Sequence, residues 1–396
     1  MNHLKTLFPA CVTDNKGNMY YVTHVEHAIK ELDLNTRRTR YIGNPGSYIP
    51  REWSGVDKIV FHNEKLYLFE QSGKEVMEYS LLEKTSRFFD LKYCMHNCDN
   101  WASCVVYNST LFMFPCFSNV LIKVDLKGNG VVEKENLCLD MDFVYMHEKS
   151  RGVSKGVELS IPHRLYSCGC QTDSDIWLFT ERKGIVLKYD LLTGTSIQRM
   201  LPKDIKGCIH AVWKEGLFYI LSTEGSVYSW NPADGKAEML FDSRNRYPFP
   251  YFCKIAVTDT NIWVMPCFGE DILIIDLKDG NERTYSACPK DFYYFEDPNM
   301  SKYYGTFEDD VNCYFAMHSA NYLLIIEKKT GKEKWLKPVE PELYEKVGYY
   351  KDYDTQEYEE SDLELKGLFM LLDEKKCDVD KAKGENTGKI MWDRLR

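Results

Sequence analysis

Short runs of large apolar residues recur along the chain, and each is followed by a polar turn and a second apolar run. In residues 261–280, two such runs flank a Gly-Glu-Asp turn, and an Asp-x-x-x-Gly turn closes the second run. Short β-rich runs joined by tight turns are typical of antiparallel hairpins. The first run of the pair recurs at 19–22, 66–69, 111–114, 176–179, 217–220, 262–265 and 314–317.

The second run of each pair recurs with a nearly constant period. Units of about 40–50 residues that contain four short strands are typical of β-propeller blades. The pattern therefore predicts an all-β, seven-bladed β-propeller. Six or eight blades would follow if an end unit is misread, and a pair of β-sandwiches is the alternative fold. The second runs end at Asp33, Ser80, Asp125, Asp190, Asn231, Asp276 and Glu327, which gives spacings of 47, 45, 65, 41, 45 and 51 residues.

Glycine follows four of these run ends at a distance of four residues. Glycine adopts positive φ without a steric penalty, which suits the tight turn into a fourth strand. The four positions are Gly194, Gly235, Gly280 and Gly331.

The last unit carries a recognisable repeat ending. Residues 322–335 contain Thr-Gly-Lys followed by Trp335, and this stretch resembles the repeat of PQQ-like propellers. The resemblance implies a propeller fold. Trp335 has no counterpart in the other units, so the tryptophan docking of those propellers and their quinone cofactor are not expected. We therefore predict no cofactor. The signature pairs of WD40 and kelch blades are absent.

The chain divides into two parts by composition. Residues 1–338 contain the repeats and are predicted to form the propeller, whereas 339–396 begin with an acidic, tyrosine-rich linker. Ser361 and Glu364 form a capping box, and apolar residues at helical spacing follow it. A short helical C-terminal extension is expected there, packed on the propeller or on a partner protein. Its apolar face would consist of Leu365, Leu368, Phe369 and Leu372.

The net charge and the cysteine content limit the classes of binding partner and the cellular compartment that we expect. The net charge of −10 disfavours nucleic acid and anionic membranes, because both bind through clusters of Lys and Arg. No run of apolar residues is long enough to span a membrane, and the start lacks the apolar stretch of a signal peptide. The 14 cysteines are scattered rather than paired in a framework, so they are interpreted as thiols. A monomeric, cytoplasmic protein is predicted.

Candidate binding residues gather on one face. In a four-stranded blade, the loops from strand four to strand one and from strand two to strand three open on the same side. The ends of the second strands should bring His24, Glu70, Cys116, Glu181, Thr223, Cys267 and His318 to this face, with Asn119 and Glu270 just beyond. The starts of the first strands should add Arg51, Trp53, Trp101, His163, Arg164, Tyr166, Lys206, Tyr251 and Tyr304.

Cations and aromatic rings around one mouth suit an anionic or carbohydrate-like small molecule, because guanidinium groups pair with anions and aromatic faces stack on rings. A protein or peptide is the other candidate ligand. The repeated Pro-Cys-Phe at 115–117 and 266–268 either lines a pocket on two sides or represents two copies of one ancestral turn.

For the cysteines that the pattern places on first strands, a role in packing is favoured over metal binding. Crowding near the axis favours small side chains on the first strands. Zinc sites need paired spacing that this chain only approximates, so no metal is expected. The cysteines placed on first strands are Cys11, Cys104, Cys168, Cys170, Cys208, Cys253 and Cys313.

No established catalytic motif is present in the sequence. We therefore predict a non-catalytic propeller that binds a ligand or a protein at the face described above. The alternative is a lyase or hydrolase that acts on an anionic sugar or peptide by His/Glu acid–base chemistry. Its candidate groups are His163 or His318 as base and Glu70 or Glu181 as acid, with His24 as a further candidate.

Overall fold

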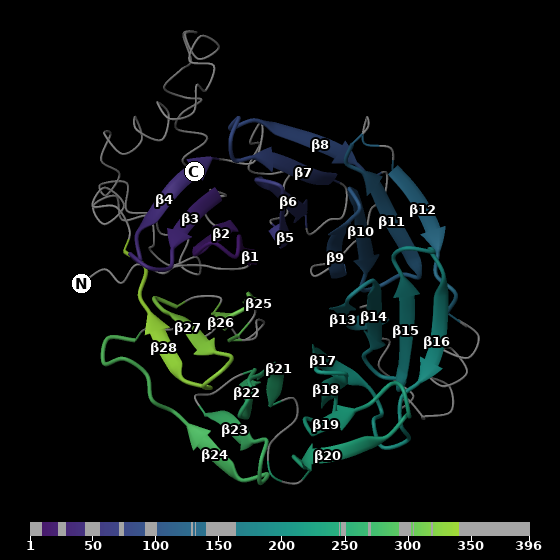
Figure 1. The fold of residues 1–396 in the computed structure, drawn as a ribbon, viewed down its shortest axis with the longest axis vertical. Coiled ribbons are helices and arrows are strands. Elements are labelled where there is room, and N and C mark those ends of the chain that lie inside the picture. The colour runs from purple at the N-terminus through teal and green to yellow at the C-terminus, as the bar shows by residue number, and fades with distance from the viewer. Residues whose placement is uncertain are drawn as a thin grey trace, which may run out of the picture.

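Seven antiparallel sheets of four strands each form a ring, and each sheet is built from four consecutive strands (Figure 1). The prediction of an all-β, seven-bladed propeller is thus confirmed, and the described part of the chain contains no helix. Blades 1 to 7 are numbered in chain order. The computed structural model describes residues 10–22, 29–43, 56–70, 75–91, 101–127, 130, 132–139, 164–244, 246, 251–267, 271–292, 302–303, 305–317 and 320–339.

The first strand of each blade lies nearest the ring axis (Figure 1). These strands mix buried and half-buried residues, because one side meets neighbouring blades and the other meets the axis. They are β1 (Ala10–Thr13), β5 (Val56–His62), β9 (Trp101–Tyr107), β13 (Tyr166–Thr172), β17 (Cys208–Lys214), β21 (Phe252–Val257) and β25 (Gly305–Glu308).

The second strands are the most apolar elements of the fold. Sheets of neighbouring blades cover both of their faces, so nearly every residue of strands such as Ile262–Met265 is buried. They are β2 (Asn18–Val22), β6 (Lys65–Glu70), β10 (Thr110–Pro115), β14 (Asp175–Thr180), β18 (Leu217–Ser222), β22 (Asn261–Pro266) and β26 (Asn312–Ala316). Cys313 therefore lies on a second strand, and its assignment to a first strand from sequence was wrong.

The third strands are also mostly buried and end in the turns that the sequence pattern identified. At the end of β15, the carboxylate of Asp190 accepts hydrogen bonds from the N–H groups of Leu192 and Thr193 at 2.8 and 2.9 Å. Gly194 then takes a φ of +70°, and the other three glycines at this position are also positive, as predicted. The strands are β3 (Ile29–Asp33), β7 (Glu75–Ser80), β11 (Val120–Asp125), β15 (Ile185–Asp190), β19 (Val227–Trp230), β23 (Ile272–Asp276) and β27 (Leu323–Glu327).

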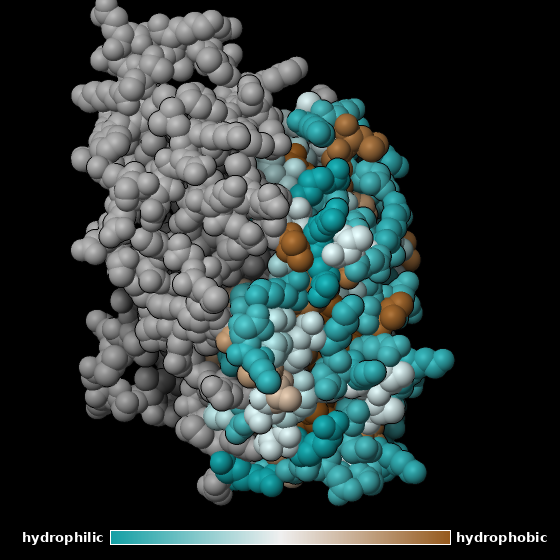
Figure 2. Space-filling model, turned by 90° about the vertical axis from the view of Figure 1, so that its left-hand side faces the viewer, coloured by the Kyte–Doolittle hydropathy of each residue, from teal (hydrophilic) through white to brown (hydrophobic). Residues whose placement is uncertain are grey.

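The fourth strands form the outer rim and are largely exposed. On the side of the ring at the left of Figure 1, the described residues are mostly hydrophilic, with some apolar residues among them (Figure 2). Scattered apolar residues are normal for a protein surface. The strands are β4 (Thr39–Gly43), β8 (Ser86–Asp90), β12 (Val132–Asn136), β16 (Ser196–Met200), β20 (Ala237–Phe241), β24 (Glu282–Tyr285) and β28 (Glu333–Leu336).

The hydrophobic core is divided among the blade interfaces. Seven clusters of buried side chains are present in the described residues, and each joins two neighbouring blades. At the interface of blades 4 and 5, Phe218 packs within 5.2 Å of the rings of Trp177, Phe179 and Trp213, measured between centroids. Aromatic contacts of this kind add to the hydrophobic stabilisation.

The ring closes without an exchange of strands between its first and last blades. Instead, Val339 pairs in parallel with Arg38 just before β4. The N–H of Val339 donates to Arg37 O at 2.7 Å, and the N–H of Thr39 donates to Val339 O at 3.0 Å. The core cluster between blades 7 and 1 completes the closure. The predicted helical extension lies outside the described residues.

Candidate functional site

The strand pairing places the starts of the first strands next to the ends of the second strands. Val56 at the start of β5 pairs with Glu70 at the end of β6, and Phe252 at the start of β21 pairs with Pro266 at the end of β22. The loops from strand four to strand one and from strand two to strand three therefore leave the sheets on one side. We call this side the entrance face.

A register shift recurs at this end of the first strands. In blades 2 to 6, one additional residue is inserted on the first strand close to the entrance face. Such β-bulges redirect the side chains that follow them. The residue after each shift pairs with an equivalent residue of the second strand. These five residues form what we call the axial layer, and they are Lys58, Ser103, Cys168, His210 and Lys254.

The axial layer contains two lysines and one histidine. Lys58, His210 and Lys254 are all half-buried, so water reaches the inner wall of the ring at this level. Ser103 and Cys168 are buried, with 9% and 8% of their surface exposed. These two residues contribute a hydroxyl and a thiol to the layer.

The positive charges near the axis lower the pKa values of the neighbouring basic groups. Burial lowers the pKa of Lys254, and the nearby positive charges of Lys58 and Arg164 lower it further. Burial also holds the pKa of His210 well below its usual value, with Lys254 and Lys58 contributing in the same direction. The imidazole of His210 is therefore neutral near pH 7. Its Nδ1 accepts a hydrogen bond from the N–H of Ile255 at 3.3 Å.

Within the part of the chain that the structure describes, no carboxylate forms an ion pair with Lys254. The carboxylate of Glu308 lies at the far end of β25 and contacts Nζ of Lys328 at 3.1 Å. Lys254 thus places a positive charge without a carboxylate partner among the described residues in the axial layer of a chain whose net charge is −10. From the sequence we identified Arg164 but missed Lys58, His210 and Lys254, because the bulges that align these residues leave no pattern in the sequence.

Three of the predicted site residues take part in blade interfaces, Tyr166 and Asn119 between blades 3 and 4 and Trp101 between blades 2 and 3. The hydroxyl of Tyr166 donates to Oδ1 of Asn119 at 3.0 Å, and the ring of Tyr166 is completely buried. The amide nitrogen of Asn119 donates to Leu137 O at 2.6 Å. Trp101 is also buried and packs edge-on against Phe69 with the ring centroids 6.4 Å apart.

Glu181 and Thr223 do lie together on the entrance face, as predicted for the ends of second strands. With Arg182 and Glu224 they line an open hollow of about 480 Å³ between blades 4 and 5. Arg182 is close to its neighbour Glu181, with Nε and Oε1 4.0 Å apart. The hollow is therefore polar and of mixed charge.

Two further predicted site residues contact residues close to them in the sequence. Nζ of Lys206 donates to Lys203 O at 2.6 Å within the same loop. Tyr251 is half-buried, and its ring packs against that of Phe252 with the centroids 4.8 Å apart. The backbone of Glu70 ends β6, but its side chain lies outside what the structure describes. The other predicted residues, His24, Arg51, Trp53, His163, Glu270, Tyr304 and His318, lie outside the described residues.

The two Pro-Cys-Phe stretches occupy equivalent places at the ends of β10 and β22. Cys116 and Cys267 are both buried. Each cysteine carbonyl accepts a hydrogen bond from the chain that leads into the next blade, from Tyr166 N at 3.0 Å and from Lys302 N at 2.8 Å. These turns join consecutive blades, which agrees with two copies of one turn.

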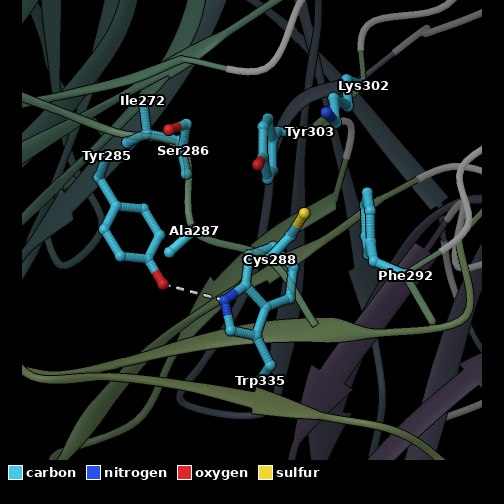
Figure 3. A pocket seen from close by; sticks show the side chains of 9 residues that line it. All are labelled: Ile272, Tyr285, Ser286, Ala287, Cys288, Phe292, Lys302, Tyr303 and Trp335. Atoms are coloured by element: carbon cyan, nitrogen blue, oxygen red, sulfur yellow. Dashed lines mark hydrogen bonds between the residues drawn. The ribbon is translucent and has the colours of Figure 1, made fainter. Parts of the chain in front are cut away.

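A second, smaller cavity lies between blades 6 and 7 (Figure 3). Nε1 of Trp335 donates to the hydroxyl of Tyr285 at 3.0 Å along its edge. Nζ of Lys302 lies 5.6 Å from the ring centroid of Phe292 and 5.9 Å from that of Tyr303. The volume of about 40 Å³ holds only a few water molecules. This cavity is therefore part of the packing between the blades.

The described residues contain no group of three His, Cys, Asp or Glu side chains arranged to bind a metal ion. In the same part of the chain, no helix is long and apolar enough to cross a membrane. All 11 described cysteines are free thiols.

Comparison with known proteins identifies a fold and no family. No protein family and no curated protein matches the sequence. Among solved structures, a catalytically inactive virginiamycin B lyase from Staphylococcus aureus with quinupristin aligns with a TM-score of 0.55 and 11% identity, covering 81% of this chain and 95% of that chain. BamB from Moraxella catarrhalis aligns with a TM-score of 0.50 and 11% identity, covering 80% and 84%.

A third structure is the extracellular domain of the one-component system BT4673 from B. thetaiotaomicron, described as putative. It aligns with a TM-score of 0.52 and 14% identity, covering 82% of this chain and 41% of that chain. At these identities the likeness shows the propeller fold alone. The resemblance of the last repeat to PQQ-like propellers is confirmed at that level.

Proposed function

We propose that this propeller binds a small anionic molecule at its entrance face, with the negative group of the ligand directed at the axial layer. The observation that carries the proposal is the alignment of Lys58, His210 and Lys254 at one level by the recurring bulges. Arg164, at the entrance side of β13, adds a third cation, within electrostatic range of Lys254. Carboxylate and phosphate groups suit such a set of donors.

The energetic argument is that a positive charge in a partly buried site opposes folding unless an opposite charge compensates it, and Lys254 has no carboxylate partner among the described residues. An anion would supply that compensation. It would accept hydrogen bonds from the ammonium group of Lys254, and Nε2 of His210 would donate when Nδ1 accepts from Ile255. The hollow beside Glu181 and Thr223 would contact the rest of the ligand.

The direct test measures thermal stabilisation and heat of binding with glucose 6-phosphate, citrate and inorganic phosphate, at fixed ionic strength and with glucose as the neutral match. A ligand that binds only the native state raises the melting temperature with concentration. We expect an effect of the anions and none of glucose. Lys254→Met should weaken binding about tenfold or more, since a hydrogen bond to a charged group contributes about 1.5–3 kcal/mol.

Lys236→Met is the matched control, because Lys236 is a highly exposed lysine on the outer side of blade 5. Equal stabilisation by glucose and glucose 6-phosphate would refute the preference for an anion. Equal binding by the Lys254→Met and Lys236→Met variants would place the ligand elsewhere.

A lyase or hydrolase is the second candidate, and the neutral state of His210 favours it. With Nδ1 accepting from Ile255, the neutral ring presents its Nε2–H, which can donate to negative charge that develops on a bound substrate. The comparison with virginiamycin B lyase adds only that this fold can host a lyase, since fold does not determine function. Turnover of a bound anion that disappears in His210→Asn, with binding retained, would favour this candidate over simple binding.

A further inference from the structure

Two cysteine thiols face each other across the interface of blades 4 and 5. Cys168 on β13 and Cys208 on β17 have their Sγ atoms 3.9 Å apart. Cys168 belongs to the axial layer and keeps 8% of its surface exposed, whereas Cys208 is fully buried. The hydroxyl of Ser167 lies 3.9 Å from Sγ of Cys168. The two sulfurs are thus neighbours, and the one on the axial wall is the more accessible.

The surroundings of the two thiols differ in a way that favours reaction. Hydrogen bonding by Cys208, with smaller contributions from Ser167 and the charge of Lys254, lowers the pKa of Cys168. Burial raises the pKa of Cys208 well above its usual value. Reactive cysteines are thiolates in electropositive, partly exposed sites, and they often have a second thiol nearby. Cys168 is only 8% exposed, but its pKa is lowered and the charge of Lys254 acts on it, while Cys208 supplies the second thiol at 3.9 Å.

The other buried cysteines near the axis differ from Cys168 because their pKa values are raised rather than lowered. Burial raises the pKa of Cys170 to about 12, and that of Cys11 is raised by the same cause. Cys253 donates its S–H to the carbonyl oxygen of Pro266 at 3.4 Å, and burial, followed by its interaction with the nearby thiol of Cys267, raises its pKa well above the usual value. A thiol that is buried and protonated reacts slowly. These residues therefore serve as internal controls.

We propose that Cys168 and Cys208 form an oxidisable dithiol whose reactant is a small hydroperoxide, and that oxidation links blades 4 and 5 by a disulfide. This inference stands on the sulfur geometry and does not depend on the proposed ligand.

The chemistry balances with hydrogen peroxide as the oxidant. The thiolate of Cys168 attacks one peroxide oxygen, the O–O bond breaks, and Cys168 becomes a sulfenic acid while hydroxide leaves and takes up a proton to become water. The sulfur of Cys208 then attacks Sγ of Cys168, the S–O bond breaks, and a second water leaves with the proton of the Cys208 thiol. Two thiols and one peroxide give one disulfide and two waters. The sulfurs must approach to about 2.05 Å, which is the length of a disulfide bond.

The test uses the full chain, reduced and freed of reductant, with one equivalent of hydrogen peroxide. Intact mass should fall by two hydrogen atoms, and peptide mapping without reduction should recover a peptide pair joined through Cys168 and Cys208. Because this experiment needs only the unmodified sequence, it does not depend on the folding of a variant. Recovery of a different pair, or of no pair, would overturn the proposal.

Variants then separate the two roles. Cys208→Ser should leave Cys168 as a sulfenic acid that dimedone traps, whereas Cys168→Ser should slow oxidation about tenfold or more, because the reactive thiolate is gone. Cys253→Ser is the matched control and should oxidise like the unmodified protein. Dimedone labelling at Cys253 or Cys170 instead of Cys168 in the Cys208→Ser variant would contradict the assignment.

Discussion

The blade interfaces and the axial layer are built from the same strands, yet their compositions are opposite. The interfaces are apolar and aromatic, with most core residues less than 9% exposed. The axial layer has half-buried basic residues, two lysines and a neutral histidine, at three of its five positions. A propeller can combine both because each blade buries its two faces against neighbours and leaves only the inner edge of its first strand near the axis. Stability therefore belongs mainly to the interfaces, and the axial layer is available for function.

The largest effect expected from this comparison is at the interface of blades 4 and 5. Phe218 is fully buried among aromatic rings, so Phe218→Ala should lower the free energy of unfolding by about 3–5 kcal/mol. Chemical denaturation followed by tryptophan fluorescence measures this change. Leu82→Ala is the control, since Leu82 is 78% exposed, and it should alter stability by less than about 0.5 kcal/mol. Equal effects of the two substitutions on the free energy of unfolding would contradict the view that the blade interfaces, and not the surface, provide most of the stability.

The next effect concerns the backbone that supports the entrance face. A Cβ atom on Gly207 would lie 2.0 Å from the carbonyl oxygen of Glu181, which is a backbone atom that cannot rotate away. Gly207→Ala should therefore cost about 1–3 kcal/mol, as overpacking does. It should also displace the hollow lined by Glu181 and Thr223. Thermal melting measures this change. An unchanged melting temperature would mean that this contact does not hold the loops of blades 4 and 5 in place.

The sequence predicted the repeating part of this architecture and missed the part that depends on register. Blade number and the turns with Gly194 and its counterparts follow from local patterns, because turn chemistry and strand alternation are encoded within a few residues. The alignment of Lys58, His210 and Lys254 depends on one inserted residue in each of three strands. A bulge changes which face a side chain meets without changing composition, so a linear pattern does not reveal it.

Acid should destabilise the axial layer before it affects the interfaces. The pKa of His210 is depressed in the native state, so below about pH 6.5 the unfolded chain binds a proton that the native chain does not. Stability therefore falls as the pH drops, by at most about 1.4 kcal/mol per pH unit for this group. Lys254 and Lys58 oppose protonation of the ring.

His210→Asn keeps an acceptor for the N–H of Ile255 and removes the titration. Denaturation between pH 5 and pH 7 should therefore show a shallower decline for this variant than for the unmodified protein. Parallel profiles would contradict a neutral, half-buried His210. His62, whose pKa is also lowered by burial, remains in both proteins and cancels in the comparison.

The smallest effect is a gain in stability from removing a charge at the axis. The pKa of Lys254 is lowered from its ordinary value of 10.5, so the native state disfavours the ammonium form. Lys254→Met retains the aliphatic stem, removes the charge, and should raise stability by about 1 kcal/mol in anion-free buffer at pH 7.

As the pH rises toward 10.5, the native lysine loses its proton before the unfolded one does, and the unmodified protein gains stability until the difference narrows. Saturating citrate or glucose 6-phosphate should close the same gap at pH 7, because only the unmodified protein would bind the anion through Lys254. A variant that is less stable than the unmodified protein under all of these conditions would show that Lys254 contributes to the fold in the same way as the interface residues, and the contrast between the two regions would fail at its central residue.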